Sequence, residues 1–270
     1  MKPRIELKKF VNPKDPIVKI SATDGLVTCK EKTPIRDVIK LVMETRKRRV
    51  LVVNKNFKGI VTVIDILDYL GAGQKGARFR NLGNPANKIM EADIPGFQEN
   101  ETIGEVLIKI KRFRKGGYPI LHEKELAGIV SDFDYMRIVN RKLKVKVRDV
   151  MNRAFFVREQ WPMLDVAKMM CNGPYRRLPV VEKGILLGIV TPYDIIKYLS
   201  DRKRFEWFRS EKARIGDIMV RRVVTIGPEK DVFDAVRIMK EKKIGGLPVV
   251  EEQELLGIIT ERDIADMLKL

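Results

Sequence analysis

The sequence predicts an α/β protein made of four repeats, each with a small three-stranded sheet and two helices. One observation is a short motif, Gly-x-x-Thr/Ser-x-x-Asp, which the chain contains four times. A second is the spacing of the motif glycines, which lie 69, 60 and 69 residues apart. Such regular self-similarity indicates a repeat architecture. The four copies are Gly59–Asp65, Gly128–Asp134, Gly188–Asp194 and Gly257–Asp263.

The elements of each repeat are predicted in the order strand, helix, strand, strand, helix. In the first repeat, Ile35, Val38 and Val42 recur at the spacing of one helix face. An acidic residue of this helix lies 13 residues before the head of an apolar run. That run and the segment after it predict two strands, and a second helix begins at each motif Thr or Ser. The acidic residues are Asp37, Glu105, Asp165 and Asp234, and the runs start at Val50, Tyr118, Leu178 and Leu247. Proline inside three of the runs (Pro119, Pro179, Pro248) predicts strands that lie at a sheet edge or begin there.

The repeats are predicted to work in pairs, because a unit of about 60 residues has too little core to be stable alone. The 69/60/69 rhythm pairs the first repeat with the second and the third with the fourth. Residues 71–76 onward and 201–214 are predicted linkers within the pairs, and residues 140–147 form a shorter bridge between them. The predicted divisions are an N-terminal segment 1–16, repeats 17–72, 86–140, 145–200 and 213–270, and modules 17–140 and 145–270.

Composition predicts a cytoplasmic protein without a membrane partner. No apolar run approaches the roughly 20 residues that span a bilayer, and the first six residues lack a signal-peptide core. Cys29 and Cys171 show no metal spacing and are predicted to be buried small hydrophobes. The single histidine, His122, is predicted to be a solvated turn residue, so neither a metal site nor histidine catalysis is expected. The 54 Lys and Arg against 36 Asp and Glu give a net charge of +18, which attracts anions.

Two interpretations of the motif stay open. A Thr or Ser with an acid three residues later is a helix capping box, which needs no ligand. Against this, a capping box favours Glu or Gln, whereas all four copies carry Asp. The hydroxyl also emerges at a strand end, and free amides at a helix start favour an anion. The second interpretation is therefore a ligand site.

The succession of a helix, Leu-Pro-Val-Val and Gly-Ile-Val-Thr-x-x-Asp resembles the CBS domain, and paired repeats resemble Bateman modules. The resemblance runs from about Ile17 to Leu270. Four such repeats with almost nothing attached are similar to the gamma subunits of AMP-activated protein kinase and their archaeal single-chain relatives. The resemblance implies up to four nucleotide sites.

The resemblance assigns a role to each motif residue. It implies that the four aspartates accept hydrogen bonds from ribose hydroxyls, and that the Thr or Ser hydroxyls reach the phosphate. It also implies phosphate contacts from basic residues before the apolar run, for which the alternative is a solvated helix C-terminus. The second and fourth repeats have Gly116-Gly117 and Gly245-Gly246 there instead. The ribose residues are Asp65, Asp134, Asp194 and Asp263, and the phosphate residues are Thr62, Ser131, Thr191, Thr260, Arg48, Arg49, Arg176 and Arg177. Apolar segments for the adenine are Val27-Thr28, Ile89-Met90, Val150-Met151 and Ile218-Met219.

The favoured function is a non-catalytic regulator that binds AMP, ADP or ATP in clefts between paired repeats and senses energy status. No Ser/His/Asp set, metal cluster or phosphate loop is present, and Gly71–Gly76 has the wrong spacing for such a loop. CBS repeats also occur within inosine monophosphate dehydrogenases, but no catalytic barrel surrounds them here. No prosthetic group is expected.

Three alternatives stay open. One is a regulator that binds S-adenosylmethionine, and another is a scaffold subunit whose basic face docks an acidic protein. The third is nucleic-acid binding through Lys109–Lys115, Arg137–Arg148 and Arg202–Arg214, the last of which interleaves Phe205, Trp207 and Phe208. Whether the protein is a monomer or a homodimer is left open.

Overall fold

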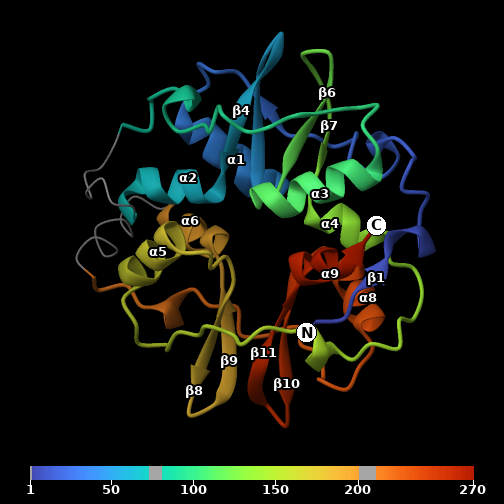
Figure 1. The fold of residues 1–270 in the computed structure, drawn as a ribbon. Helices are drawn as coiled ribbons and strands as arrows, with labels where there is room; N and C mark the ends of the chain where they lie inside the picture. The colour runs from blue at the N-terminus through green and yellow to red at the C-terminus, as the bar shows by residue number, and fades with distance from the viewer. Residues whose placement is uncertain (1, 73–80, 201–210) are drawn as a thin grey trace. The chain divides into compact units, whose positions relative to one another are not determined.

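The computed structural model describes residues 2–72, 81–200 and 211–270 (Figure 1). By its internal contacts the chain divides into two compact units. Unit 1 contains Met1–Leu26, Ile94–Ala154 and Val224–Leu270, and unit 2 contains Val27–Asp93 and Phe155–Val223. The strands and α-helices of the second and fourth repeats therefore lie in unit 1, and those of the first and third lie in unit 2. The small sheets and helices confirm the predicted α/β class.

In unit 1, repeat 2 has the predicted element order, and repeat 4 has it except for the first strand. Repeat 2 contains β5 (Phe97–Gln98), α3 (Ile103–Phe113), β6 (Tyr118–His122), β7 (Glu125–Val130) and α4 (Asp132–Ile138). Repeat 4 contains α8 (Val232–Lys242), β10 (Gly246–Glu251), β11 (Glu254–Thr260) and α9 (Glu261–Met267). Each hairpin is antiparallel, and β5 runs parallel to β6. Repeat 4 has only a single parallel bridge, from Ile226 to Val249, in place of a third strand.

Short elements complete unit 1. The strand β1 (Ile5–Glu6) pairs in parallel with β12 (Leu268–Lys269), which directly follows α9. Three 3₁₀ helices are η1 (Leu7–Lys9), η2 (Ile17–Lys19) and η5 (Val147–Asp149). The β1–β12 pairing holds the residues before Ile5 close to the end of repeat 4.

Unit 2 repeats the same plan. Repeat 1 contains β2 (Thr28–Cys29), α1 (Ile35–Thr45), β3 (Arg49–Asn54), β4 (Asn56–Thr62), α2 (Val63–Leu67) and a π-helical turn, η3 (Asp68–Ala72). Repeat 3 contains α5 (Met163–Asn172), β8 (Leu178–Glu182), β9 (Ile185–Val190) and α6 (Pro192–Leu199), and the 3₁₀ helices of the unit are η4 (Ala86–Lys88) and η6 (Ile215–Asp217). The β3–β4 and β8–β9 hairpins are antiparallel, and β2 is parallel to β3. In repeat 3 the third strand is again one bridge, from Val157 to Val180.

Each unit has its own hydrophobic core, in which the apolar faces of the helices cover the sheets. In unit 1, α4 packs against α9 (Figure 1). Arg262 of α9 donates from Nε to Oδ2 of the buried Asp132 on α4, at 3.0 Å. In unit 2, α2 packs against α6. Among the described residues, no helix has both the length and the apolar content to span a bilayer.

The segment that opens each repeat packs on a sheet of the neighbouring repeat. In unit 2, Glu91 from the start of repeat 2 bridges to Ile60 of β4, with N–O distances of 3.0 and 2.9 Å. In unit 1, Ala22 from the start of repeat 1 bridges to Ile129 of β7. Repeats 3 and 4 exchange their opening segments in the same way. Those bridges join Asn152 to Ile258 and Val220 to Ile189.

The compact units differ from the predicted modules 17–140 and 145–270. The units follow helix packing, because α2 with α6 and α4 with α9 come from alternate repeats. The opening segments, by contrast, are exchanged between repeats 1 and 2, within residues 17–140, and between repeats 3 and 4, within residues 145–270. The division into these modules therefore stays a prediction. The predicted linkers fall largely on residues 73–80 and 201–210, which lie outside the described residues, as does part of Gly71–Gly76.

Of the two alternatives predicted from proline, an edge position does not hold for β6, which lies between β5 and β7, whereas a strand that begins near its proline does. Pro119 is the second residue of β6, and β5 pairs with β6 only from Ile120 onward. In repeat 3, the carbonyl of Pro179 accepts from the amide of Val157 at 3.0 Å. The neighbouring segment hydrogen-bonds to the carbonyl of this proline and needs no N–H from it. A strand with a neighbour on each side can therefore contain a proline at this position.

Candidate ligand-binding site

All four motifs form the same capping box at the start of the second helix of a repeat. In each, Oδ2 of the aspartate accepts from both the backbone amide and the hydroxyl of the Thr or Ser three residues earlier. The two distances are 2.7 and 2.7 Å at Asp65, 2.8 and 2.9 Å at Asp134, 2.8 and 2.6 Å at Asp194, and 2.9 and 2.6 Å at Asp263. The capping interpretation is therefore realised, but it uses only one oxygen of each carboxylate.

The second oxygen, Oδ1, differs from repeat to repeat. At Asp263 it accepts from the Asn152 side-chain amide and lies 3.4 Å from Lys2 Nζ. At Asp134 it lies 3.7 Å from a guanidinium nitrogen of Arg137. Among the described residues, no hydrogen bond from another residue reaches Oδ1 of Asp65 or Asp194. These two carboxylates therefore keep acceptor capacity for a ligand.

Burial shapes the electrostatics of these two aspartates. Burial raises the pKa of Asp65, hydrogen bonds from Thr62 oppose the rise, and the nearby Glu91 and Asp68 add to it. Burial likewise raises the pKa of Asp194, while Thr191 and Lys197 lower it. A buried carboxylate with spare lone pairs is stabilised by any ligand that brings hydrogen-bond donors.

The hydroxyls predicted to reach phosphate are already used as donors. Thr62 Oγ1 donates to Asp65 Oδ2 at 2.7 Å, and the other three hydroxyls do the same in their motifs. A phosphate oxygen is an acceptor, so contact with it requires the hydroxyl proton to turn away from the carboxylate. Phosphate contact by these hydroxyls stays a prediction.

The predicted arginines lie beside the motifs of repeats 1 and 3. Arg49 opens β3 and stands directly opposite Thr62 in the β3–β4 register, while the carbonyl of Arg48 accepts from the amide of Val63 at 3.2 Å. Arg177 directly precedes β8. Arg176 donates to the carbonyls of Met170 and Gly173, both at 2.7 Å. Arg176 thus has the helix C-terminal role that was the alternative to phosphate contact, and the phosphate role of the four arginines stays a prediction.

Sequence reasoning missed the role of the motif glycines, which admit the exchanged opening segments. A Cβ on Gly59 would lie 2.6 Å from the carbonyl oxygen of Glu91, and one on Gly257 would lie 2.6 Å from that of Asn152. Real Cβ atoms do not approach that closely, so a side chain would displace the segment. Glycine at a fixed strand position was the available signal, since it often marks a close backbone approach.

The matching protein-family model is that of the CBS domain, and it covers residues 15–72, 86–141, 147–201 and 215–270. The chain belongs to the CBS-domain family. Its four CBS repeats form two tandem pairs, as the resemblance in the sequence predicted.

Two relatives are similar over most of this CBS-domain chain. Protein MJ1225 of Methanocaldococcus jannaschii is 31% identical over 92% of this chain and 97% of its own. The crystal structure of MJ1225, described as a proposed archaeal homologue of γ-AMPK, matches with a TM-score of 0.83, 29% identity and coverage of 93% and 99%. A 33.4 kDa protein encoded in the ribosomal RNA operon of Thermofilum pendens is 26% identical over 87% of this chain and 85% of its own.

The segments proposed to hold adenine in these CBS repeats are partly core. Ile89, Met90 and Ile218 are half-buried against the core of unit 2, and Val150 is fully buried in unit 1. Thr28 is exposed. Their contact with adenine stays a prediction.

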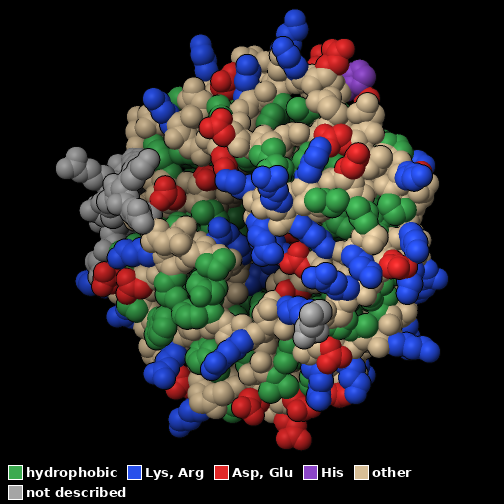
Figure 2. All heavy atoms as spheres, viewed as in Figure 1, with side chains coloured by type: hydrophobic (Ala, Val, Ile, Leu, Met, Phe, Trp, Pro, Cys, Tyr) green, Lys and Arg blue, Asp and Glu red, His purple; other side chains and the backbone are tan. Residues whose placement is uncertain are grey.

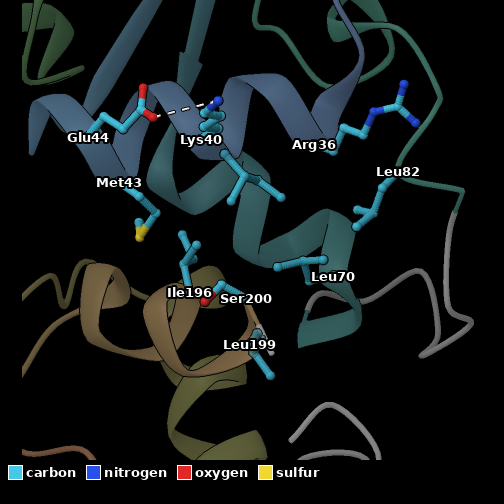
Figure 3. A pocket seen from close by; sticks show the side chains of 10 residues that line it. Arg36, Lys40, Met43, Glu44, Leu70, Leu82, Ile196, Leu199 and Ser200 are labelled. Atoms are coloured by element: carbon cyan, nitrogen blue, oxygen red, sulfur yellow. Dashed lines mark ion pairs between the residues drawn. The ribbon is translucent and has the colours of Figure 1, made fainter. Parts of the chain in front are cut away.

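Unit 2 also has a cavity of about 440 Å³ between α1, η3 and α6 (Figure 3). Its walls are mostly apolar, and Lys40 and Glu44 of α1 form an ion pair of 3.8 Å at its edge. None of the predicted site residues is among the side chains that line it, so it is separate from the motif. The lining includes Ile39, Met43, Leu70, Leu82, Ile196 and Leu199.

Two of the three basic stretches predicted for nucleic acid, Lys109–Lys115 and Arg137–Arg148, make contacts within unit 1. Lys109 pairs with Glu101, and Lys111 donates to the carbonyls of Asp266 and Leu268. Lys146 and Arg148 both pair with Glu229. Figure 2 shows acidic side chains interspersed among the Lys and Arg on the viewed face. Phe205, Trp207 and Phe208 lie outside the described residues.

The cysteines are free thiols, Cys29 buried and Cys171 half-buried, and burial raises the pKa of both, that of Cys171 to about 12. His122 is exposed and its Nδ1 lies 2.6 Å from Glu99, a contact that raises its pKa. Among the described residues there is no cluster of three His, Cys, Asp or Glu side chains that could hold a metal.

Proposed function

We propose that this CBS-domain protein is a non-catalytic regulator that binds AMP, ADP or ATP through the motif aspartates of repeats 1 and 3 and reports energy status by competition among them. The observation that carries the proposal is the half-used carboxylate of Asp65 and Asp194. In each, Oδ2 accepts the hydrogen bonds of the helix cap, and Oδ1 can accept a hydrogen bond from a ligand. A ribose offers a pair of adjacent hydroxyl donors, which matches a single acceptor oxygen with two lone pairs.

Two further features support a nucleotide. Arg49 stands opposite Thr62, and the planar guanidinium group suits bidentate contact with phosphate. MJ1225, described as a proposed homologue of a γ-AMPK subunit, matches this chain over nearly its whole length. That likeness supports a regulatory role without a catalytic one.

The exchanged segments suggest how binding becomes a signal. Asp65 belongs to repeat 1, and Glu91, close enough to raise its pKa, belongs to the opening segment of repeat 2. A ligand held at Asp65 touches parts of both repeats. Such a ligand shifts the equilibrium between their arrangements by its difference in affinity for each one.

The decisive experiment changes the carboxylate to an amide of the same shape. In Asp65→Asn combined with Asp194→Asn, the amide oxygen can still accept the capping bonds, but a donor NH₂ replaces Oδ1. AMP affinity measured by isothermal titration calorimetry should fall roughly 10- to 100-fold, because a hydrogen bond to a charged group contributes about 1.5–3 kcal/mol. The exposed Asp24→Asn is the matched control and should bind like the wild type.

The ligand supplies the complementary test. Wild-type protein should bind 2′-deoxy-AMP more weakly than AMP, and the double Asn variant should no longer distinguish them. Equal affinity of the wild-type protein for both nucleotides would contradict diol recognition. Titrations with ADP, ATP and S-adenosylmethionine then rank the ligands, and a clear preference for S-adenosylmethionine would replace the energy-sensing role with the alternative regulator.

A further inference from the structure

Repeat 4 differs from repeats 1 and 3 in how fully its aspartate is used. A carboxylate offers about four lone-pair positions. At Asp263, Thr260 supplies two donors to Oδ2, and Asn152 and Lys2 supply two to Oδ1. The acceptor capacity of this side chain is therefore filled from within the protein. No acceptor position of Asp263 is left for the two hydroxyl groups of a ribose.

We propose that Lys2 and Asn152 occupy the place of a ligand at the repeat-4 motif. Nucleotide then binds at Asp65 and Asp194, and it reaches Asp263 only when these two side chains move away. The proposal rests on the proposed function. It assigns Lys2 and Asn152 as the residues that decide which motifs take a nucleotide.

Asn152 is placed by the exchanged segment. Its backbone exchanges two 2.9 Å hydrogen bonds with Ile258, the residue after the motif glycine of repeat 4. The residues that bridge to the same place in the other repeats are Ala22, Glu91 and Val220. Alanine and valine have no side-chain donor, and a glutamate carboxylate is an acceptor. Only repeat 4 therefore has a side-chain amide at this position.

Lys2 is placed by the pairing of β1 with β12, because β12 directly follows the helix that carries Asp263. Its Nζ lies 2.8 Å from Oδ1 of Asn152 as well as 3.4 Å from Asp263. The ammonium thus joins both side chains in one small network. The side chain of Asp263 is only 9% exposed and that of Lys2 is 43% exposed, so the lysine can leave while the aspartate stays in place.

The arginine pattern points the same way. The arginine pairs precede the strands of repeats 1 and 3, whereas repeat 4 has Gly245-Gly246 at that position. The repeats with acceptor capacity are thus the ones with extra cationic groups for a phosphate. Repeat 4 has neither.

The test counts bound AMP by native mass spectrometry in matched variants of the full chain. In the wild-type background, Asp263→Asn should leave the count unchanged. Lys2→Met combined with Asn152→Ala should add one bound AMP, and adding Asp263→Asn to that pair should remove it again. Loss of a bound AMP from the single Asp263→Asn variant, or no gain in the double variant while other sites fill, would overturn the proposal.

A second measurement needs no nucleotide. If Lys2 contacts Asp263, Lys2→Met should lower the Tm of the wild-type chain more than that of Asp263→Asn, because the contact with Asp263 is already lost there and only the contact with Asn152 remains. Equal losses in both backgrounds would overturn the proposal. If this coupling is present and no variant binds AMP, the internal contact stands and the proposed function is what fails.

Discussion

At the scale of single residues, the informative quantity is how many acceptor positions an aspartate has left. Asp65 and Asp263 sit in the same motif with the same cap, yet they differ in what reaches Oδ1. Capping and ligand binding are therefore compatible uses of one carboxylate, because each takes a different oxygen. The sequence left open whether the aspartate caps its helix or binds a ligand. One oxygen caps the helix, and the other can bind a ligand where no residue of the protein already occupies it.

A prediction about pH follows from the raised pKa values of Asp65 and Asp194. Protonation removes acceptor capacity, so affinity for adenosine should fall as the pH drops from neutral toward these pKa values. Stability of the free protein should move in the opposite direction. A folded-state pKa above the ordinary 3.8 means that the folded chain binds more protons than the unfolded chain in that window, so the free energy of unfolding rises as pH falls into it.

Adenosine is the suitable ligand for this test, because a phosphate with a second pKa of about 6 would add its own titration. Affinity comes from calorimetry and stability from urea unfolding at each pH. The double variant Asp65→Asn and Asp194→Asn is the control, and the difference between it and wild type isolates these two groups. If both proteins show the same pH dependence, the two aspartates neither bind the diol nor carry raised pKa values.

The contacts of Asp263 mark where residue-level prediction from sequence stops. Its capping partner is three residues away and follows from the motif. Asn152 and Lys2 are 111 and 261 residues away, and no local pattern relates them to the motif. They meet Asp263 only because an exchanged segment and a terminal strand pair are both in place.

At the scale of elements, the exchanged opening segments explain features that helix and strand patterns left unassigned. The predicted helix starts are correct because Thr62 and its three counterparts carry their own caps. The third strands of repeats 3 and 4 are reduced to single bridges at Val157 and Ile226, which alternating hydrophobicity alone does not predict. Strand length here depends on distant pairing, and so does the tolerance of Pro119 in the central strand β6.

Gly59→Ala tests the importance of the exchange for stability. The new Cβ would meet the carbonyl oxygen of Glu91 at 2.6 Å, a backbone atom that moves only with its segment. The free energy of unfolding in urea should fall by about 1–3 kcal/mol. Gly227→Ala is the matched control, because the nearest atom to its Cβ would be 3.9 Å away on a lysine side chain. Its stability should change by no more than about 0.5 kcal/mol, and equal losses in the two variants would show that close approach is not what the motif glycine provides.

At the scale of the whole molecule, the excess of positive charge acts on stability as well as on partners. A net charge of +18 opposes the compact state through self-repulsion, although many basic side chains have acidic partners nearby. The internal contacts of Lys109, Lys111 and Lys146 reduce what the basic stretches of unit 1 can offer a polyanion. The excess positive charge is thus distributed over many sites. Its effect on folding should be a general repulsion that added salt can screen.

Added salt should therefore stabilise the protein. Raising NaCl from about 10 mM to about 150 mM shortens the Debye length from about 30 Å to about 8 Å, which weakens repulsion among exposed charges. We expect a gain of about 1 kcal/mol, seen in thermal unfolding as a Tm higher by about 2–4 °C. Chloride is preferred to sulfate or phosphate, because those anions could bind at the proposed phosphate positions. The control changes the exposed Lys14, Lys30, Lys88 and Lys124 to Glu, which lowers the net charge from +18 by eight to +10 and should reduce the dependence on salt. If salt instead lowers the Tm of both proteins, the paired charges outweigh the repulsion, and the basic excess has no cost for the fold.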